Sequence, residues 1–379
     1  MADRARAASK ISNLFGDASL TEVDRAIAEL RAGRPVIVAR DGDVFLVSAA
    51  ETASVERIAA MGSVSNGSVT LVLTPSRLRA LGRLGLDGPM AVEAAGLDRD
   101  RLMALTAEPG THLREPLVAV DRAGEAALQL AKFALLLPAV LMAPLAPAAM
   151  PTGAITVDAD AITRFGEHRA TRVEIVSRAP VPLLAARSCE FVVFRGGEGM
   201  REQVAVVVGD PDPARPVLVR LHSACLTGDL FGSLRCDCGD QLRSTVSTMA
   251  QGGGGVLLYL DQEGRGTGIA NKIRAYGLQH GGLDTYEADE ALGFDLDGRR
   301  FEFAADMLRR LGYSRIVLMT NNPEKVEALR LAGLDVTGVE RIYGRRGADN
   351  VRYLAAKRDR AGHFLDLDVL DQHAPTSCG

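Results

Sequence analysis

The chain has 379 residues, of which 47% are hydrophobic and 24% charged, and its formal net charge is −4. This length favours two domains, and the weakly acidic balance argues against non-specific nucleic-acid binding, which depends on neutralising phosphates. Five cysteines, an odd number in a long chain, argue against a disulfide framework. The N-terminal residues lack the apolar stretch of a signal peptide, so we expect a cytoplasmic protein.

The first half mixes helices and strands. Thr21 is a candidate N-cap for a helix that ends near Gly33. Two β-branched runs, residues 35–39 and 69–73, are typical of strands, and residues 128–137 are typical of a buried helix.

One apolar run, residues 133–150, is long enough to consider as a membrane span. It contains Pro138, Pro144 and Pro147, and prolines repeatedly break a helix. We interpret it as a buried helix that ends near Pro138, followed by a core segment, and expect no membrane contact.

The second half alternates more regularly between strands and helices. We expect, in chain order, strands at 203–208 and 216–221, a helix around 242–249 ending in glycines, a strand at 256–260, helices at 269–278 and 301–311, a strand at 316–319, and a helix that begins at Pro323. The fold class is therefore α/β (α+β), with a mixed sheet and flanking helices in each of two domains. Gly, Asp and Thr are frequent between about 150 and 171, which places the domains at 1–165 and 170–367, followed by a flexible tail at 368–379.

A cysteine cluster carries the strongest chemical signal. Ten residues separate Cys225 from Cys236, and one separates Cys236 from Cys238. Three thiolates bind Zn²⁺ well, and three ligands with an open position are typical of a catalytic zinc, which lowers the pKa of a bound water to about 7. Buried free cysteines are the alternative, but neighbours such as Arg235 make the segment too polar for a plain core. His222 could be a fourth ligand or a substrate contact.

A glycine-rich segment, residues 261–279, follows an expected strand and leads into a helix. Its glycines would let the backbone approach an anion near a helix N-terminus. They form neither the dinucleotide fingerprint nor a P-loop, and a tight turn would explain them equally well. Arg265 and Glu263 favour a nucleotide, because Arg binds phosphate bidentately and Glu can accept hydrogen bonds from guanine.

Two more polar turns are candidates for the site. Thr320 and Lys325 could meet phosphates, although a helix cap with a solvated lysine is the simpler explanation. Asp297 could act as a base and Arg299 as a phosphate partner, with a surface ion pair as the alternative.

Together these segments resemble GTP cyclohydrolase II, the first enzyme of riboflavin synthesis, over about residues 172–365. The matching blocks are VRLHSACLTGDLFGSLRCDCGDQL, GVLLYLDQEGRGTGIANKIRAYGLQ, GLDTYEADEALGF, LMTNNPEKVEAL and NVRYLAAKRDRAGHFL. The resemblance implies hydrolysis of GTP to 2,5-diamino-6-ribosylamino-4(3H)-pyrimidinone 5′-phosphate, formate and pyrophosphate. It also implies one Zn²⁺ per subunit on the three cysteines, Mg²⁺ with GTP, and a homodimer.

The resemblance assigns roles to individual residues. Asp297 would be the proton acceptor, Arg299 the nucleophile at the α-phosphorus, and Tyr276 a residue near the base that assists the ring chemistry. Electrostatic clamping by Arg299 is the alternative, because a guanidinium stays protonated. The residues lining the GTP site would be Arg220, His222, Ser223, Gln241, Glu263, Gly264, Arg265, Thr285, Thr320 and Lys325.

Two departures lie beside these positions, because Ala224 replaces the Glu usual in the family and Asp261 replaces an Arg. They leave room for a variant that stops at the formamide intermediate. A non-catalytic regulatory or scaffolding paralogue is a further alternative, which the retained cysteines argue against.

The first half resembles dihydroxybutanone-phosphate synthase in LTEVDRAIAELRAGRPVIVARDGD and GEAALQLAKFALLLPAV. Its acidic run is shortened to DGDVF, Ala123 and Gly124 replace a His-Thr pair, and Pro144 replaces a metal-binding Glu. Without these groups there is no Mg²⁺ site and no acid/base set. We therefore expect a folded domain that is inactive in that reaction and that supports the dimer or regulates its partner domain.

Overall fold

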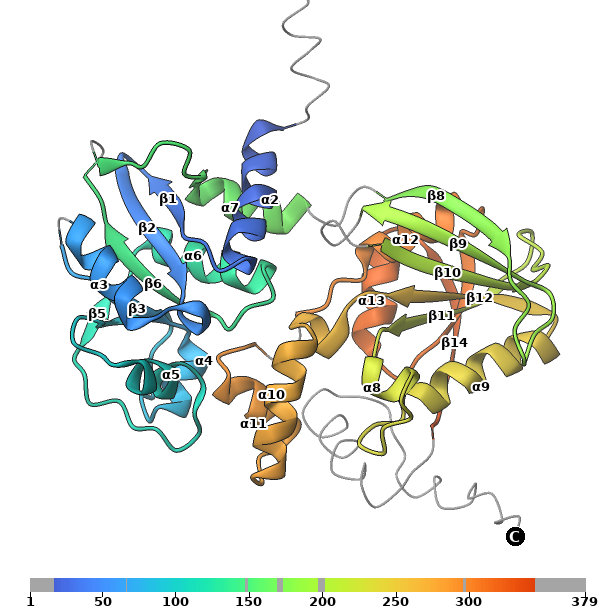
Figure 1. The fold of residues 1–379 in the computed structure, drawn as a ribbon. Helices are drawn as coiled ribbons and strands as arrows, with labels where there is room; N and C mark the ends of the chain where they lie inside the picture. The colour runs from blue at the N-terminus through green and yellow to red at the C-terminus, as the bar shows by residue number, and fades with distance from the viewer. Residues whose placement is uncertain are drawn as a thin grey trace, which may run out of the picture. The chain divides into compact units, whose positions relative to one another are not determined.

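The computed structural model describes residues 17–65, 67–146, 149–168, 173–196, 202–295 and 298–344. The chain forms two compact units. Unit 1 consists of Met1–His168, Arg274–Leu278 and Glu287–Leu296, and unit 2 of Arg169–Ile273, Gln279–Tyr286 and Asp297–Gly379. Each unit holds one seven-stranded mixed sheet with flanking helices, which confirms the expected fold class (Figure 1).

The sheet of unit 1 has the order β5-β4-β3-β6-β2-β1-β7, in which only the β1–β7 pair is parallel among the described strands. Two hydrophobic clusters pack on its opposite faces, one with α2, α6 and α7 and the other with α3, α4 and α5. The elements are α2 (Ala18–Arg31), β1 (Val36–Arg40), β2 (Asp43–Ala49), α3 (Val55–Val64), β3 (Thr70–Leu73), α4 (Pro75–Ala80), β4 (Met90–Glu93), α5 (Arg99–Ala107), β5 (Leu117–Ala119), α6 (Arg122–Phe133), β6 (Ala139–Pro144), β7 (Thr156–Asp158) and α7 (Ala159–His168).

Two expectations for the first half were wrong. The N-cap of α2 is Asp17, whose carboxylate accepts from the Ser19 N–H at 2.9 Å, and Thr21 lies one turn inside the helix. The buried helix expected to end near Pro138 is α6, which already ends at Phe133, and the expected core segment after Pro138 contains the central strand β6. The segment expected to hold the domain boundary contains β7 and α7, and the division between the two units falls between His168 and Arg169. Within the described residues, no helix is both long and apolar enough to cross a membrane.

An ion pair in unit 1 gives a pH-dependent contribution to stability. The Arg101 guanidinium donates to both Glu115 carboxylate oxygens at 2.8 Å, and these hydrogen bonds lower the pKa of Glu115 from 4.5 to about 2. The contribution is complete above pH 4.5 and is lost as the pH falls toward 2. We expect Glu115→Gln to destabilise unit 1 by about 1 kcal/mol at pH 7 and by much less near pH 2.5. Urea unfolding followed by circular dichroism checks this, and an equal destabilisation at both pH values would contradict it.

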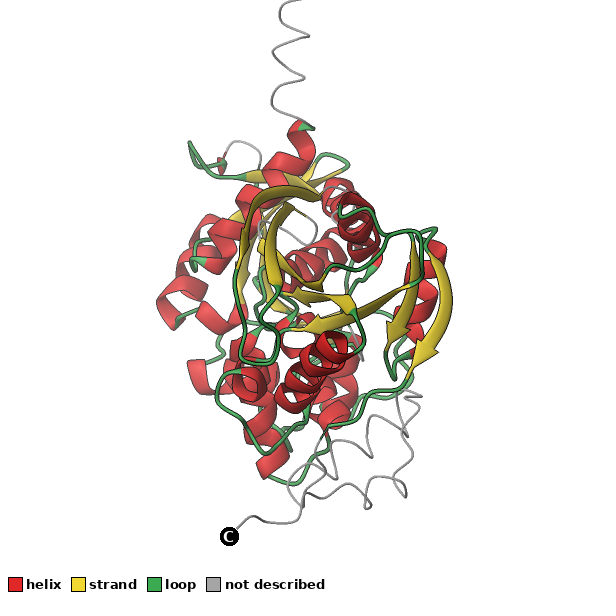
Figure 2. Cartoon of the chain, turned by 90° about the vertical axis from the view of Figure 1, so that its right-hand side faces the viewer, coloured by secondary structure: helices red, strands yellow, loops and turns green. Residues whose placement is uncertain are grey.

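The sheet of unit 2 has the order β14-β13-β11-β12-β10-β9-β8. Strands β14, β13, β11 and β12 run parallel, and β10, β9 and β8 continue the sheet antiparallel. The strands twist strongly, as those facing the viewer in Figure 2 show. The elements are β8 (Val173–Pro180), β9 (Cys189–Gly196), β10 (Glu202–Gly209), β11 (Val217–Ser223), α8 (Leu226–Asp229), α9 (Cys238–Gln251), β12 (Gly254–Leu260), α10 (Ile269–His280), α11 (Thr285–Ala291), α12 (Glu302–Arg310), β13 (Arg315–Met319), α13 (Pro323–Leu331) and β14 (Asp335–Glu340).

The two faces of this sheet are covered differently. Helices α12 and α13 bury Phe303, Leu308 and Leu329 against one face, and α9 buries Val246 and Met249 against the other. Because β14, β13, β11 and β12 run parallel, their carboxyl ends meet at one edge of the sheet. Ligands bind at this edge in open α/β sheets.

Candidate active site

The sequence-predicted residues of unit 2 gather at the carboxyl ends of its parallel strands. Arg220, His222 and Ser223 lie among the last four residues of β11. Glu263 follows β12, and Thr320 directly follows β13. The parallel register pairs Ser223 with Leu260, the last residue of β12, so these strand ends lie side by side. One edge of the sheet thus presents polar side chains from three strands.

The three cysteines form a compact cluster. Cys225 precedes α8, Cys236 precedes α9, and Cys238 is the first residue of α9. Their three Sγ atoms all lie within 4.8 Å of one another, and Cys225 Sγ is 3.6 Å from Cys236 Sγ. Hydrogen bonds from Cys236 and Cys238, with Lys272 close by, hold the pKa of Cys225 far below its usual range. The hydrogen bond shared with Cys225 raises the pKa of Cys236 to about 11.

Two glycines leave room for this cluster. A Cβ at Gly228 would lie 2.7 Å from Cys236 Sγ and 3.0 Å from Cys225 Sγ. A Cβ at Gly239 would lie 2.1 Å from the carbonyl oxygen of Gly228, which is closer than any real contact. The backbone of α8 therefore packs directly against the start of α9, and this packing brings the three sulfur atoms together.

His222 lies outside the group of potential metal ligands. Its Nε2 is 3.1 Å from both carboxylate oxygens of Asp229, and its ring stacks on Tyr259 with the centroids 5.6 Å apart. Burial lowers the pKa of His222, which keeps the imidazole neutral with Nε2–H donating to Asp229. This arrangement favours a positioning or substrate-contact role over that of a fourth ligand.

Glu263 forms a hydrogen bond with the segment that carries Cys225. Its carboxylate accepts from the Leu226 N–H at 2.6 Å and from Lys272 Nζ at 2.8 Å. Lys272 Nζ also lies 3.0 Å from Cys225 Sγ. Gly264 and Arg265 follow with φ values of 61° and 59°, a tight left-handed turn that is costly for a residue with a side chain. Sequence reasoning missed Lys272, although its place in the glycine-rich block next to a candidate anion site was a usable signal.

Buried cations occupy the same edge of the sheet. Arg220 is 7% exposed and donates to Met319 O at 2.9 Å and to Gln241 Oε1 at 2.6 Å. Burial lowers the pKa of Arg220 to about 10, so the guanidinium is still charged at neutral pH. Lys325 is 5% exposed and donates to Leu221 O at 2.8 Å, so the alternative of a solvated lysine was wrong. Positive charge buried at this edge is suited to a phosphate chain.

Comparison with known proteins agrees with this geometry. A family model described as GTP cyclohydrolase II matches residues 174–342. A GTP cyclohydrolase-2 from Xylella fastidiosa is 45% identical over 367 residues, which cover 94% of this chain and 90% of the relative. The chain belongs to the GTP cyclohydrolase II family.

Other relatives also extend over the N-terminal half. A GTP cyclohydrolase-2 from Azospirillum brasilense is 38% identical, over 92% of this chain and 95% of its own length. A riboflavin biosynthesis protein RibBA from Salinispora tropica is 36% identical, over 90% of this chain and 98% of its own length. A solved two-domain 3,4-dihydroxy-2-butanone 4-phosphate synthase from A. baumannii covers 85% of the chain at 18% identity, but its TM-score of 0.31 is too low to support an argument.

Fewer contacts are described for the remaining predicted residues. Thr285 begins α11, and its carbonyl accepts from Arg265 Nη2 at 3.2 Å. The Arg299 guanidinium lies 5.4 Å from the ring centre of Phe301. Tyr276 is partly buried on α10, within a segment assigned to unit 1. Asp297, the tail at 368–379 and the block NVRYLAAKRDRAGHFL lie outside the described residues.

Asp229 is a positioning residue that sequence reasoning missed. Besides His222, its carboxylate accepts from the Cys225 N–H at 2.9 Å and from the Tyr259 hydroxyl at 3.0 Å. It thereby fixes the backbone of the first cysteine. A signal was present in the sequence, since Asp229 lies one turn after Cys225 inside the block that resembles the family.

We expect Asp229→Asn to lower metal affinity by roughly 10- to 100-fold, the range for partners that orient metal ligands. The amide cannot accept all three donors in the same way, so the Cys225 backbone loses its fixed position. Competition with a chromogenic chelator measures the affinity. Asp306→Asn, on the surface of α12, is the control, and equal affinities for the two variants would contradict the role of Asp229.

Proposed function

We propose that this chain hydrolyses GTP at the carboxyl edge of the unit 2 sheet, to formate, pyrophosphate and the 2,5-diaminopyrimidinone ribosyl 5′-phosphate. The observation that carries the proposal is the pairing of a three-cysteine cluster with buried cations at one sheet edge. The first suits a Lewis-acidic metal and the second suits a triphosphate.

The donor set fits Zn²⁺, one per subunit, held by Cys225, Cys236 and Cys238. Sulfur ligands favour a borderline-soft ion, and the glycine backbones of Gly228 and Gly239 leave the space that the three sulfur atoms occupy. Zinc with three protein ligands would supply a Lewis acid that activates water for attack on guanine. Mg²⁺ would accompany the triphosphate and neutralise part of its charge.

The residues of the chain have distinct proposed tasks. Arg220, Thr320 and Lys325 hold the phosphate chain, and the neutral imidazole of His222 presents its buried Nδ1, which has no hydrogen-bond partner among the described residues, as an acceptor. The remaining proposed residues follow the resemblance to the family: Ser223, Gln241, Glu263, Gly264, Arg265 and Thr285 contact GTP, Asp297 accepts a proton, Arg299 attacks or clamps the α-phosphate, and Tyr276 assists at the base.

The two departures from the family pattern are close together. Ala224 N–H donates to Leu260 O at 2.7 Å, which places it beside Asp261, the next residue. They alter one corner of the site and leave the cysteines and buried cations in place. A reaction that stops at the formamide intermediate is therefore the second candidate.

Product analysis tests the proposal. Zinc-loaded protein is incubated with GTP and Mg²⁺, and formate, pyrophosphate and the pyrimidine product are quantified separately. We expect all three in equal amounts. If neither pyrophosphate nor the pyrimidine product forms, the proposal is overturned. Pyrophosphate without formate would favour the truncated reaction.

We further propose that the N-terminal region is inactive as a synthase. Gly124 stands where a threonine is expected, and a Cβ there would lie 2.2 Å from Val120 Cγ1, so a side chain at this position would require Val120 to move. Addition of ribulose 5-phosphate should yield no dihydroxybutanone phosphate. We also propose that the chain forms a homodimer and acts in the cytoplasm, where the cysteines stay reduced.

A further inference from the structure

Gln262 is a fully buried polar residue at the carboxyl end of β12, and the reaction proposed above gives it no task. It lies two residues after Leu260, the last residue of β12, and is 0% exposed. The next residue, Glu263, is proposed to contact GTP. A buried amide is costly unless both of its ends find hydrogen-bond partners, so the partners of Gln262 indicate what it does.

The two ends of the amide contact different parts of unit 2. Nε2 of Gln262 donates to the backbone carbonyl of Arg300, and Oε1 accepts from the Ser223 hydroxyl at 3.3 Å. The carbonyl can only accept, so it determines which end of the amide faces it. One buried side chain thus connects the end of β11 with the turn that precedes α12.

The residues on both sides of Arg299 are held against the turn that follows β12. Gly298, before it, donates its N–H to Arg265 O at 3.3 Å, and the carbonyl of the residue after it accepts from the glutamine amide. The two backbones lie close together, because a Cβ at Gly266 would be 3.2 Å from Gly298 O and 3.6 Å from Arg299 N. Hydrogen bonds therefore fix the backbone that carries Arg299.

The side chain of Arg299 lies among other cations. Its guanidinium is 5.4 Å from the ring centre of Phe301, and Lys325 Nζ is 5.1 Å from the same ring, which is 4% exposed. Besides burial, the positive charge of Arg299 lowers the pKa of Arg220, so these two guanidinium groups repel each other. A turn that was free to move would carry Arg299 away from the other two cations.

We propose that Gln262 is a positioning residue for Arg299. Its amide holds the Arg300 carbonyl and so keeps the neighbouring Arg299 beside the other cations, where a phosphate chain would lie. This proposal rests on the proposed function. A displacement of about 1 Å in a reacting group can cost about 100-fold in rate. A glutamine that only stabilises the fold is the alternative, and it predicts lost stability without a selective loss of turnover.

Two substitutions at Gln262 test this role in the full-length protein. Gln262→Met keeps the length of the side chain and removes both hydrogen bonds. Gln262→Glu keeps the shape but presents an acceptor to the Arg300 carbonyl, where a donor is needed. For each variant we measure kcat and KM for GTP, bound zinc and the free energy of unfolding. We expect kcat to fall roughly tenfold or more, with zinc content unchanged and a smaller change in KM.

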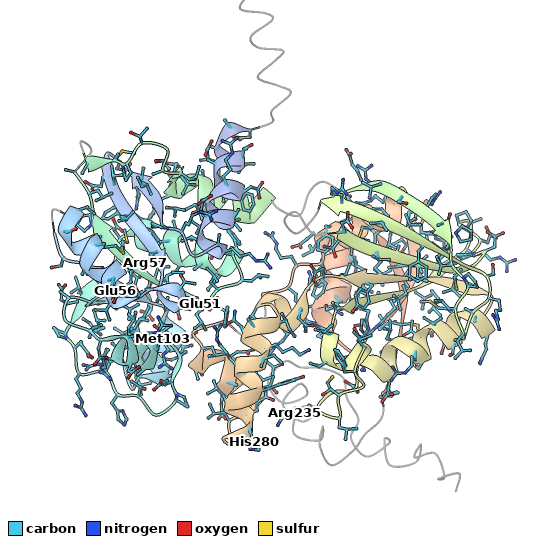
Figure 3. The ribbon with its side chains drawn as sticks, viewed as in Figure 1. Glu51, Glu56, Arg57, Met103, Arg235 and His280 are labelled. Carbon is cyan, nitrogen blue, oxygen red and sulfur yellow. The ribbon has the colours of Figure 1, made fainter. Side chains whose placement is uncertain are left out.

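Two controls separate positioning from general destabilisation. Gln203→Met removes another buried amide of the same sheet, since Gln203 is 0% exposed and its Oε1 accepts from the Asp261 N–H at 2.7 Å. This variant should lose stability to a similar degree and keep the wild-type kcat. His280→Gln changes an exposed side chain at the end of α10, labelled in Figure 3, and should match the wild type in every measurement.

A double-mutant cycle with Arg299→Ala shows whether Gln262 acts through Arg299. If it does, Gln262→Met should lower pyrophosphate release by less than about twofold once Arg299 is already alanine. A residue that only stabilises the fold would cost the same factor in both backgrounds, and that result would overturn the proposal. Hydrogen exchange of peptides covering residues 298–304 gives a second readout, and it should be faster in both Gln262 variants.

Folded Gln262→Met and Gln262→Glu proteins with the wild-type kcat would overturn the proposal, as would unchanged exchange in both. If Gln262→Met does not fold, Gln262→Glu takes its place in the cycle. If Arg299→Ala releases no measurable pyrophosphate, exchange together with the kcat of the single variants decides the matter. If the wild type does not turn over GTP, the proposed function fails, and exchange still shows whether Gln262 holds the turn.

Discussion

Cys236→Ser is expected to abolish GTP turnover, with kcat at least about 100-fold lower, and to leave far less than one zinc per chain. Cys236 Sγ lies 3.6 Å from Cys225 Sγ, and a serine hydroxyl neither ionises at neutral pH nor offers a soft ligand. Formate release and elemental analysis of the purified protein measure the two effects. Removing metal with a strong chelator should give the same loss of activity, and adding zinc should restore it in the wild type.

Cys189→Ser is the matched control for this experiment. Cys189 is a buried thiol in the same unit, and its Sγ lies 3.2 Å from Ala186 O, outside the cluster. This variant should keep its zinc and its turnover. A Cys236→Ser protein that binds zinc fully and releases formate at the wild-type rate would show that the cluster is not the metal site.

Gly239→Ala should have the second largest effect, on metal content and on the stability of unit 2. The new Cβ would lie 2.1 Å from Gly228 O and 2.9 Å from Gly228 C, so α8 has to move away from α9 and separate the sulfur atoms. We expect a loss of about 3 kcal/mol or more in the free energy of unfolding, because a backbone atom cannot yield as a flexible side chain can. Urea unfolding and zinc analysis measure these changes.

Gly277→Ala is the control for that substitution. Gly277 lies within α10, and a Cβ there would meet no atom within 4 Å. Alanine is the better helix former by about 1 kcal/mol, so this variant should be as stable as the wild type or slightly more stable. Equal behaviour of the two alanine variants would contradict the close packing at Gly239.

Local patterns predicted most of unit 2 and the cysteine cluster. Strands β10 to β13 are short β-branched runs bounded by turn residues, and Pro323 marks the start of α13. Residues adjacent in the sequence are therefore enough to predict these elements. The strand β6 was missed because a fully buried strand and a buried helix both read as a continuous apolar run. The N-cap at Asp17 was missed because Thr21, one turn later, offers the same hydroxyl chemistry.

Contacts between distant parts of the chain could not be predicted in this way. Arg77 and Ala291 are 214 positions apart, and the acceptor is a backbone carbonyl, which every residue type provides. Asp229 was passed over for a related reason, because its role depends on three donors that come together only when β11 and β12 pair. The candidate metal ligands were predictable because chemistry restricts such ligands to a few residue types, whereas the residues that hold the three cysteines in place are restricted less strictly.

The closeness of the three cysteines in the sequence has a consequence for folding. All of them lie between positions 225 and 238, so a chain that has not yet formed its sheet can already bring them together by closing a short loop. An unfolded chain that binds zinc gains less stability from the metal on folding than one whose ligands come from distant strands. Zinc should therefore raise the midpoint of urea unfolding by less than its affinity for the folded protein implies, and it can organise this segment before the rest of the unit folds.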